Sequence, residues 1–330
     1  MQRKFLIIGS NSFSGASFIK VLLQNGYDVI GMSKHKEIEK PFNPYSKITT
    51  GNFHFIQIDL LRDYKKVVDW CSVNERPVVI NFAAQSMVAE SWTSPWDWYD
   101  TNIVALSRLT SELVTKKIEL DRFINFSTPE VYGTTNEWIS ESFNFKPNSP
   151  YAISRAAGDQ HLRLLFENFN FPVIFTRAAN VYGEFQPSYR LIPKALCYGL
   201  IGKKFPLQGN GVSERSFIHI DDVSNALIKI INNGVIGSTY HISTNRIEKI
   251  STILKICAEQ LKINFKDFCE ISNERIGKDF AYKLSSQYLR DTLKWGDSVN
   301  LETGISNTLG WVEENLNDIL LTPSPFDYRG

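Results

Sequence analysis

Cysteine is scarce in this sequence. The four cysteines among 330 residues stand apart from one another, and no two of them form a CxxC pair. This spacing indicates buried thiols of a reducing compartment and argues against a disulfide framework or a zinc site. The five histidines are dispersed along the chain and add no ligand cluster, so we expect no metal ion.

An excess of charge of either sign is also absent. Lysine and arginine number 36, aspartate and glutamate 35, and the formal net charge is +1. Such a balance lacks the basic surface that attracts nucleic acid or an anionic membrane. No apolar run is long enough to span a bilayer, and the N-terminus shows no signal-peptide pattern. We therefore expect a cytoplasmic protein that binds neither nucleic acid nor a membrane.

The chain contains an alternation of apolar strands and amphipathic helices, without internal repeats or low-complexity segments. Residues 4–8 form an apolar run that breaks at Gly9, a helix is predicted over 16–25, and a second strand over 27–32. This is the first unit of a dinucleotide-binding sheet, with phosphate at the helix N-terminus. Later strands are predicted over 53–59, 78–82, 123–127 and 173–176. The alternation to about residue 180 predicts an α/β fold with a parallel sheet covered on both faces.

Two short phrases carry the chemistry, at residues 123–133 and 149–155. An apolar strand ends at Ser127 and is followed by the hydroxyl of Thr128 and the carboxylate of Glu130. Tyr151 opens a helix, and Arg155 stands four residues on, so the two share a helix face. A hydroxyl, a carboxylate, a phenol and a cation are the groups needed to oxidise an alcohol and then move a neighbouring proton.

These phrases, STPEVYG and SPYAISR, resemble those of the extended short-chain dehydrogenase/reductase family. Within it they are most similar to the nucleotide-sugar 4,6-dehydratases, lyases whose phrases read roughly ST(D/S)E(V/M)YG and SPYxxxK. Two positions depart from that pattern: Pro129 stands where those enzymes have Asp or Ser, and Arg155 where they have Lys. The resemblance extends over nearly the whole chain.

The resemblance implies a Rossmann-type doubly wound parallel sheet and a smaller C-terminal mixed α/β domain that binds the substrate. We expect the dinucleotide-binding domain to comprise residues 1–180, with some later segments returning to it. The nucleotide-sugar-binding domain is expected to comprise residues 181–330. The substrate would lie between them, at the carboxyl ends of the strands.

The resemblance also implies the reaction, which begins with oxidation at C4 of the sugar. Tyr151 as phenolate takes the proton of the 4-hydroxyl, Thr128 hydrogen-bonds the 4-oxygen, and hydride passes to the nicotinamide. Because the pKa of a free phenol is about 10, Arg155 and the positive nicotinamide ring must favour its ionisation. Glu130 then removes the C5 proton, water leaves from C6, and hydride returns to C6. Since Pro129 has no proton to give, we expect Glu130 to protonate the leaving hydroxyl.

Cofactor choice is expected to be set after the second strand. Ser33, Lys34 and His35 occur there, and no acid precedes Glu37. Cations and hydroxyls suit the 2′-phosphate of NADP, whereas NAD enzymes place an acid there for the ribose 2′-hydroxyl. We therefore expect NADP, with NAD as the alternative.

The family's GxxGxxG turn reads here as Gly9, Ser12 and Gly15, so its middle glycine is missing. The resemblance places Asp59 near the adenine and Asn102, at the start of a helix over 102–115, near the cofactor. The expected cofactor contacts are Gly9, Asn11, Ser12, Phe13, Ser14, Gly15, Ser33, Lys34, His35, Asp59, Leu60, Ala83, Ala84, Gln85, Asn102, Tyr151 and Arg155.

Several phrases resemble the family's sugar-nucleotide contacts. The AAQS phrase at 83–86 is closer to GDP-mannose 4,6-dehydratases than to their dTDP-glucose relatives, which usually read AAES. A GDP-sugar is therefore favoured, with dTDP-, UDP- and CDP-sugars as alternatives. Asn180, Arg215 and Arg275 match family positions that contact the diphosphate or base. The full set of expected substrate contacts is Ser86, Thr128, Glu130, Asn180, Leu191, Lys194, Arg215 and Arg275.

Other functions stay open at this point. A 4-epimerase uses the same tyrosine and transient ketone, typically without a carboxylate at Glu130. A decarboxylase of UDP-uronic acids keeps a glutamate there and adds an arginine for the sugar carboxylate. The fold also occurs in non-catalytic NADP-binding sensors, but these generally lose the tyrosine or the hydroxyl, and Thr128 and Tyr151 are both present.

The aromatic residues Trp92, Trp96, Trp98 and Tyr99 favour packing or a subunit contact over a sugar platform. In the family, the helix expected over 102–115 often packs into a two-helix dimer interface. We expect a homodimer or homotetramer.

Overall fold

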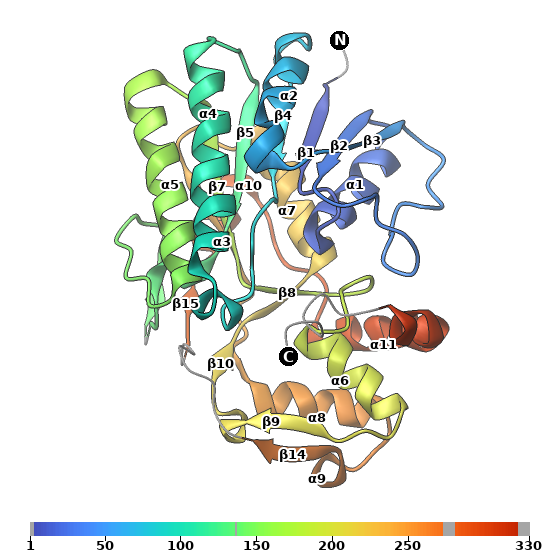
Figure 1. Ribbon diagram of the computed structural model, residues 1–330. Coiled ribbons are helices and arrows are strands. Elements are labelled where there is room, and N and C mark those ends of the chain that lie inside the picture. Colours follow the sequence, from blue (N-terminus) through green and yellow to red (C-terminus); the bar gives the residue numbers. More distant parts are fainter. Residues whose placement is uncertain (1–2, 136, 273–280, 323–330) are drawn as a thin grey trace.

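The computed structural model describes residues 3–135, 137–272 and 281–322, and its centre is a parallel sheet of seven strands (Figure 1). Across the sheet the strands follow the order β12, β7, β5, β4, β1, β2, β3. They are β1 (Phe5–Ile8), β2 (Val29–Ser33), β3 (Phe53–Gln57), β4 (Val78–Asn81), β5 (Arg122–Ser127), β7 (Val173–Ala178) and β12 (Thr239–Ile242). The predicted doubly wound α/β fold is confirmed.

Helices cover both faces of this sheet (Figure 1). One face carries α2 (Leu60–Ser72), α4 (Leu106–Thr115) and α5 (Pro150–Phe169), and the other carries α1 (Phe13–Gln24), α7 (Ile220–Asn233) and α10 (Gln287–Leu293). Successive side chains of a strand point to opposite faces. In β1, Phe5 and Ile7 accordingly pack in the core with α1 and α7, whereas Leu6 and Ile8 pack in the core with α2 and α4. A strand buried on both sides is therefore a continuous apolar run, which is how β1 reads in the sequence.

The strand order reverses at β1, which lies between β2 and β4. The chain leaves β1 for α1 on one face and leaves β4 for the helices of the other face. The connections therefore diverge at the carboxyl ends of β1 and β4 and leave a crevice there. Ligands of doubly wound sheets bind at such a switch point.

A second core lies below the sheet in Figure 1. Its elements are α6 (Leu191–Leu200), β9 (Phe205–Gln208), η4 (Gly209–Gly211), β10 (Glu214–Arg215), β13 (Glu248–Lys249), α8 (Ile250–Gln260), α9 (Phe265–Phe268), β14 (Cys269–Ser272) and α11 (Leu301–Leu321). Two short parallel pairs complete the fold: β8 (Asn180–Tyr182) with β11 (Phe217–His219), and β6 (Trp138–Ile139) with β15 (Lys283–Leu284). We propose that the chain divides into two domains near residue 180, with α7, β12 and α10 returning to the first.

Two helices begin before the residues predicted from the sequence. The helix expected from residue 16 begins at Phe13, because the side chain of Ser12 caps it by accepting the N–H of Gly15. The helix expected over 102–115 is preceded by α3 (Pro95–Tyr99) and by η2 (Asp100–Ala105), a π-helical turn that leads into α4. Wider turns of this kind break the helical period, so the apolar pattern did not reveal the start.

Within the described ranges, no helix combines the length and apolarity needed to cross a bilayer. The same residues contain no group of three or more His, Cys, Asp or Glu side chains arranged to hold a metal ion. Cys71, Cys197 and Cys257 are buried and unpaired, and Cys269 is half-buried.

Candidate active site

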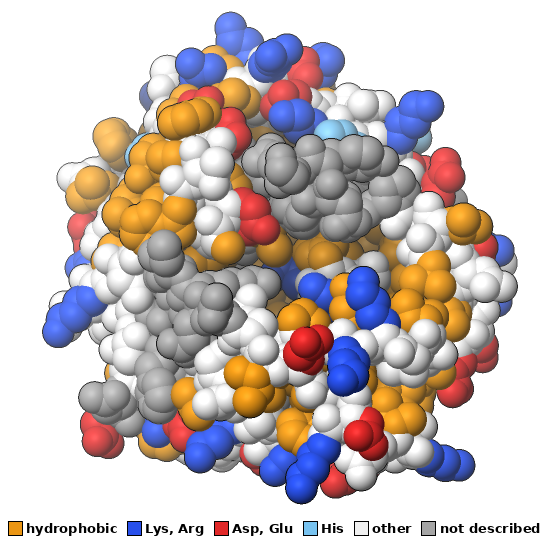
Figure 2. Space-filling view, turned by 60° about the horizontal axis from the view of Figure 1, so that its bottom comes forward, with side chains coloured by type: hydrophobic (Ala, Val, Ile, Leu, Met, Phe, Trp, Pro, Cys, Tyr) orange, Lys and Arg blue, Asp and Glu red, His pale blue; other side chains and the backbone are white. Residues whose placement is uncertain are grey.

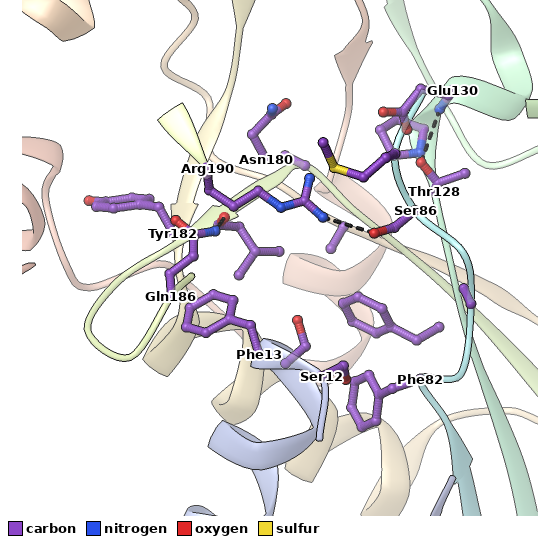
Figure 3. Close-up of a pocket in the computed structure, with 18 of the residues that line it drawn as sticks. Ser12, Phe13, Phe82, Ser86, Thr128, Glu130, Asn180, Tyr182, Gln186 and Arg190 are labelled. Carbon is purple, nitrogen blue, oxygen red and sulfur yellow. Dashed lines mark hydrogen bonds between the residues drawn. The ribbon is translucent and has the colours of Figure 1, made fainter. Parts of the chain in front are cut away.

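A cavity of about 420 Å³ lies between the carboxyl ends of the sheet strands and the second core. Ser12, Phe13 and Thr128 line it from the side of the sheet, and Asn180 and Arg190 from the opposite side (Figure 3). The face turned forward in Figure 2 is hollowed near its centre, with Lys or Arg side chains beside the hollow. The cavity is where the doubly wound sheet predicts a ligand.

The four residues predicted to be catalytic all line this cavity. Thr128 follows the last residue of β5 and caps η3 (Pro129–Tyr132), in which Glu130 is the second residue. Tyr151 and Arg155 come from the first turns of α5, which Ser149 caps by accepting the N–H of Ala152 at 3.2 Å. A strand end and a helix start thus bring the hydroxyl, carboxylate, phenol and guanidinium to one wall.

The phenol of Tyr151 is buried, and this burial raises its pKa to about 12. The negative charge of Glu130 adds to the increase. The charge of Arg155, a hydrogen bond from Thr128 and the charge of Arg190 act in the opposite direction. The protein alone therefore keeps the phenol protonated at neutral pH, and a further positive charge is needed to ionise it.

Arg155 is almost fully buried and is fixed by the strand next to it. Its Nη2 donates a hydrogen bond to the backbone carbonyl of Phe126 in β5. Its Nε is buried and has no hydrogen-bond partner among the described residues. A buried N–H without a partner is costly, so this atom suits an oxygen of a bound ligand such as a ribose hydroxyl.

The turn between β1 and α1 has the shape of a dinucleotide site. Gly9 has a φ of +79°, and a Cβ there would lie 2.5 Å from the backbone N of Ala83. A Cβ on Gly15 would lie 2.5 Å from the backbone oxygen of Gly9. The Ser12 hydroxyl donates to that same oxygen at 2.7 Å and accepts from the Gly15 N–H, so Ser12 closes the turn with its side chain.

The remaining predicted cofactor residues near this turn divide into two groups. Asn11, Ser12, Phe13 and Ser14 line the cavity. Ala84 and Gln85, after β4, also line it, whereas Gly9, Gly15 and Ala83 shape the turn behind the wall. The donor set and the close approach of the backbone fit a dinucleotide diphosphate.

The loop after β2 lies outside the cavity wall. Lys34 Nζ is 3.5 Å from Asp59 Oδ2, and Asp59 caps α2 by accepting the N–H of Leu61. The side chain of Asn11 donates to the backbone oxygens of His35 and Lys36. Ser33 and Leu60, the other two residues predicted here, end β2 and begin α2. The positive charge expected to meet a 2′-phosphate thus lies beside a carboxylate.

Asn102 lies behind the wall. Its Oδ1 accepts the N–H of Gln85 at 2.9 Å, and its Nδ2 donates to the Gln85 carbonyl and to Ser154 Oγ. It therefore holds the strand-end loop against α5, and it does not line the cavity.

The predicted substrate residues also divide. Ser86, Thr128, Glu130, Asn180 and Leu191 line the cavity. Lys194 and Arg215 do not line it, and Lys194 Nζ lies 5.4 Å from the centre of the Tyr198 ring.

Arg215 stacks beside the cavity. Its guanidinium lies 4.5 Å from the centre of the Tyr282 ring and donates to the backbone oxygen of Glu214. Tyr282 lines the cavity and donates its hydroxyl to Asn180 Oδ1 at 2.7 Å. Arg215 therefore lies one aromatic ring away from the cavity. Arg275 lies outside the described residues.

Several residues that line the cavity were not predicted from the sequence. Arg190 is the residue before α6. Its side chain extends across the cavity and donates to Ser86 Oγ at 2.8 Å (Figure 3). The others include Met87, Tyr182, Gln186, Tyr189 and Tyr282. Tyr182, Gln186 and Tyr189 lie between Asn180 and Leu191, and Met87 directly follows the AAQS phrase, so proximity to predicted residues was their local signal. Trp92 and Trp96 are exposed, Trp98 is buried, and none of them lines the cavity.

A buried charged network supports this wall from behind. Asp159 of α5 accepts hydrogen bonds from Ser127 Oγ at 2.8 Å and from Asn125 Nδ2 at 2.9 Å, both in β5. It also forms an ion pair with Arg177 of β7, 3.0 Å from Nη2, and both side chains are fully buried. Because α5 carries Tyr151, the network fixes the position of the phenol relative to the end of β5.

Comparison with known proteins shows a family match over most of the chain. The model of the NAD dependent epimerase/dehydratase family matches residues 5–243. The chain is 28% identical to a dTDP-glucose 4,6-dehydratase of Neisseria meningitidis, over 95% of this chain and 94% of that protein. It is 27% identical to a dTDP-glucose 4,6-dehydratase of Escherichia coli, over 94% of each chain.

Among solved structures, the fold is similar to that of a dTDP-glucose 4,6-dehydratase from Streptomyces venezuelae with NAD and TYD bound. The TM-score is 0.88 at 26% sequence identity, over 95% of this chain and 98% of that chain.

Proposed function

The chain belongs to the NAD dependent epimerase/dehydratase family, and from this we propose that it is a nucleotide-sugar 4,6-dehydratase. It would convert a nucleoside diphosphate hexose into the 4-keto-6-deoxy sugar. The observation that carries the proposal is that Glu130 lines the same cavity as Thr128 and Tyr151. Oxidation at C4 needs only the hydroxyl and the phenol, whereas loss of water across C5 and C6 needs a second acid and base.

The first step is oxidation at C4. Tyr151 takes the proton of the 4-hydroxyl, and Thr128 hydrogen-bonds the oxygen as it becomes a carbonyl. A nicotinamide dinucleotide in this cavity would supply the hydride chemistry, as acceptor for C4 and donor for C6. Arg155, with its buried Nε, would hold the ribose and keep positive charge beside the phenol.

The second step is elimination of water. The C4 ketone acidifies the C5 proton, and Glu130 removes it. The C6 hydroxyl leaves as water when Glu130 gives its proton to that oxygen, so the carboxylate is restored. C6 would then accept the hydride and C5 a proton, and this second proton is balanced by the one that Tyr151 took from the 4-hydroxyl in the first step. Pro129 fills the position next to Glu130 without a donor, so one carboxylate serves in both directions.

We propose NAD as the cofactor, in place of the NADP expected from Ser33, Lys34 and His35. Lys34 lies beside the carboxylate of Asp59, whose charge would repel a 2′-phosphate. The Streptomyces relative was solved with NAD. Titration of both cofactors tests this: wild type should bind NAD more tightly, and Asp59→Asn should weaken that preference. Tighter binding of NADP by wild type would restore the original expectation.

For the nucleotide, we propose a pyrimidine nucleoside diphosphate hexose of the dTDP-glucose kind. The relatives named above are dTDP-glucose enzymes, and the GDP-sugar expected from the AAQS phrase has no support among them. Incubation with dTDP-, UDP-, GDP- and CDP-glucose and with GDP-mannose, followed by mass spectrometry, tests both the nucleotide and the reaction. Loss of one water from the dTDP-sugar is the expected result, and loss from a GDP-sugar alone would overturn the pyrimidine assignment.

A second candidate function follows from Arg190. Its guanidinium lies in the cavity, and its positive charge lowers the pKa of Tyr151, against the effect of burial. The planar guanidinium group also matches the geometry of a carboxylate. Decarboxylation or 4-epimerisation of a nucleotide uronic acid would use such a cation. Adding UDP-glucuronic acid to the panel separates the two, because either reaction proceeds without loss of water from the sugar.

For the quaternary structure we propose a homodimer built on α5. Ile153 and Leu164 are eleven residues apart, so they lie on one face of this helix. They are 44% and 56% exposed, and Trp96 on the adjoining α3 is 62% exposed. Light scattering should give twice the monomer mass, and Leu164→Glu should shift the protein towards the monomer.

A further inference from the structure

The backbone of Tyr151 is held by a residue from outside its own helix. The N–H groups in the first turn of a helix have no partner within it. In α5, Pro150 has no N–H, and Ser149 accepts the N–H of Ala152 with its side chain. The N–H of Tyr151 remains, and it donates at 3.2 Å to Ser91 Oγ, 60 residues earlier in the chain. Ser91 thus completes the capping of α5 at the residue that carries the phenol.

The hydroxyl of Ser91 is oriented for this contact. Ser91 lies in η1 (Glu90–Trp92), which packs against α5, and it is fully buried. Its O–H donates to the backbone oxygen of Val88 at 2.6 Å, so the lone pairs of its oxygen can accept from Tyr151. A buried N–H without a partner is costly, so removal of this oxygen would favour a displaced helix start.

The carbonyl of Tyr151 is held by a second path. Ser154 Oγ donates to this carbonyl at 2.7 Å and accepts from Asn102 Nδ2 at 2.9 Å. Asn102 in turn bonds both backbone groups of Gln85. Gln85 and Ser91 both lie in the segment between β4 and α3. This one segment is therefore connected to both backbone polar groups of Tyr151, one directly and one through two side chains.

We propose that Ser91 is a positioning residue for the first hydride transfer, and that its hydroxyl sets the place of the Tyr151 phenol relative to the ligand. This inference rests on the base role of Tyr151 in the proposed function, but not on the later loss of water. The phenol must lie within hydrogen-bond distance of the proton it takes, and displacement by about 1 Å can lower a rate by about 100-fold. Because Ser91 does not line the cavity, it acts through the backbone of Tyr151.

The test separates the rate of hydride transfer from ligand binding. NAD-loaded protein is mixed rapidly with increasing concentrations of dTDP-glucose, and reduction of the nicotinamide is followed by absorbance within a single turnover. Ser91→Ala removes the acceptor, and we expect the maximal rate to fall by about 10- to 100-fold. The concentration of dTDP-glucose that gives half the maximal rate should change by less than about twofold, because Ser91 does not line the cavity.

Two further substitutions separate the hydrogen bond from packing. Ser91→Cys keeps the shape of the side chain, but sulfur is a weak acceptor, so the rate should fall nearly as far as in Ser91→Ala. Ser91→Thr keeps the hydroxyl and should recover most of the rate.

Ser107→Ala is the matched control. Ser107 lies on α4, outside the cavity lining, and its Oγ donates to the backbone oxygen of Val104 at 3.0 Å, as Ser91 does to Val88. Its loss should leave the rate unchanged. Circular dichroism and urea unfolding show whether each variant is folded.

Each outcome decides the proposal. A maximal rate in Ser91→Ala close to that of wild type would overturn it, as would a rate in Ser91→Cys equal to that of wild type, which would leave packing as the only role of this side chain. A higher half-saturating concentration with an unchanged maximal rate would assign Ser91 to ligand binding and also overturn it. If wild type reduces its cofactor but releases no water, the proposed dehydration fails, and the rates of the variants still decide the role of Ser91.

Discussion

At the scale of single residues, the phenol of Tyr151 depends most on its surroundings. Burial and the charge of Glu130 raise its pKa to about 12, while Arg155 and Arg190 oppose them. At neutral pH the protein alone therefore keeps the phenol protonated. The phenolate therefore needs the positive charge of the oxidised nicotinamide.

We predict that the rate of hydride transfer rises with pH, because the fraction of ionised Tyr151 rises with pH. The single-turnover rate of cofactor reduction, followed by nicotinamide absorbance, should increase up to tenfold per pH unit below the pKa of the complex. Arg155→Met removes a charge that stabilises the phenolate, so the rise of the rate should shift to higher pH. Arg155→Lys keeps the charge and should leave the pH dependence nearly unchanged. A rate independent of pH in wild type would contradict the role of the phenolate.

Tyr151→Phe should keep the fold and the bound cofactor but lose turnover. General acid–base help of this kind contributes about 10²–10⁴-fold, and no other described side chain in the cavity is placed to ionise at C4. Cofactor content and circular dichroism are the controls. A near-normal rate of product formation in this variant would remove Tyr151 from the mechanism.

Glu130→Gln separates the two halves of the reaction. The carboxamide cannot remove the C5 proton, so release of water should fall by about 10²–10⁴-fold. The first hydride transfer does not use Glu130, and its loss also removes a charge that opposes the phenolate, so the reduced cofactor should accumulate. Normal dehydration by this variant would assign the C5 proton to another group.

The sequence revealed some of these residues and not others, for a physical reason. Thr128 and Glu130 follow a strand and Tyr151 and Arg155 open a helix, so local patterns place all four at the sheet's carboxyl edge. Arg190 meets Ser86 across the cavity, and no local pattern encodes a contact between residues 104 positions apart. The ion pair of Lys34 with Asp59 was missed for the same reason, and it is the observation behind the proposed preference for NAD.

At the scale of elements, the buried pair Asp159–Arg177 joins α5 to β7 and, through Ser127, to β5. Burying two charges is costly, but removing only one leaves the other uncompensated. Asp159→Asn or Arg177→Met alone should therefore destabilise the protein by about 3–5 kcal/mol. The variant with both substitutions should lose less unfolding free energy than the sum of the losses of the two single variants.

Urea unfolding followed by circular dichroism measures these losses. The exposed pair Arg163–Glu167 on the same helix is the comparison, and Glu167→Gln should cost less than about 1 kcal/mol. Additive losses for Asp159 and Arg177 would show that the two charges do not depend on each other.

Element boundaries were predicted less well than element order. The apolar runs of β1, β4 and β7 are buried on both faces, so composition alone marked them as strands. The start of α1 depends on the side chain of Ser12, and the start of the helix before α4 on a π-helical turn. Such features depend on single hydrogen bonds, which hydrophobic periodicity does not report.

At the scale of the whole molecule, His241 links stability to pH. It is fully buried in β12, and burial, with the charge of Arg177, lowers its pKa to about 3. Its Nδ1 lies 3.1 Å from the Ser285 carbonyl, so this nitrogen carries the proton and Nε2 accepts from the Tyr132 hydroxyl at 2.8 Å. The neutral imidazole with its proton on Nδ1 satisfies both partners.

A histidine with a lowered pKa stabilises the fold above its unfolded pKa of about 6.5, and this contribution falls as pH decreases towards 3. We predict a loss of up to about 1.4 kcal/mol of unfolding free energy per pH unit in that window. Burial raises the pKa of Glu141, which accepts the backbone N–H of His241, and this change makes the stability fall as pH rises, opposite to the effect of His241. His241→Asn should flatten the slope, and exposed His54→Asn, the control, should not.

The proposed division into two domains was expected from the alternation of strands and helices together with the family phrases. Some later segments were also expected to return to the first domain, but order along the chain did not identify β12, which joins the sheet beside β7 after the second core has begun. The cavity lies where the loop bearing Arg190 faces the residues that follow β4 and β5.

The central claim is that one hydride leaves C4 and returns to C6 of the same sugar. The most direct measurement uses dTDP-glucose carrying deuterium at C4, with the product examined by mass spectrometry and NMR. We predict a product lighter by one water that retains the deuterium, now in its C6 methyl group. Deuterium recovered at C4 of a sugar of unchanged mass would contradict the dehydratase and show an epimerase.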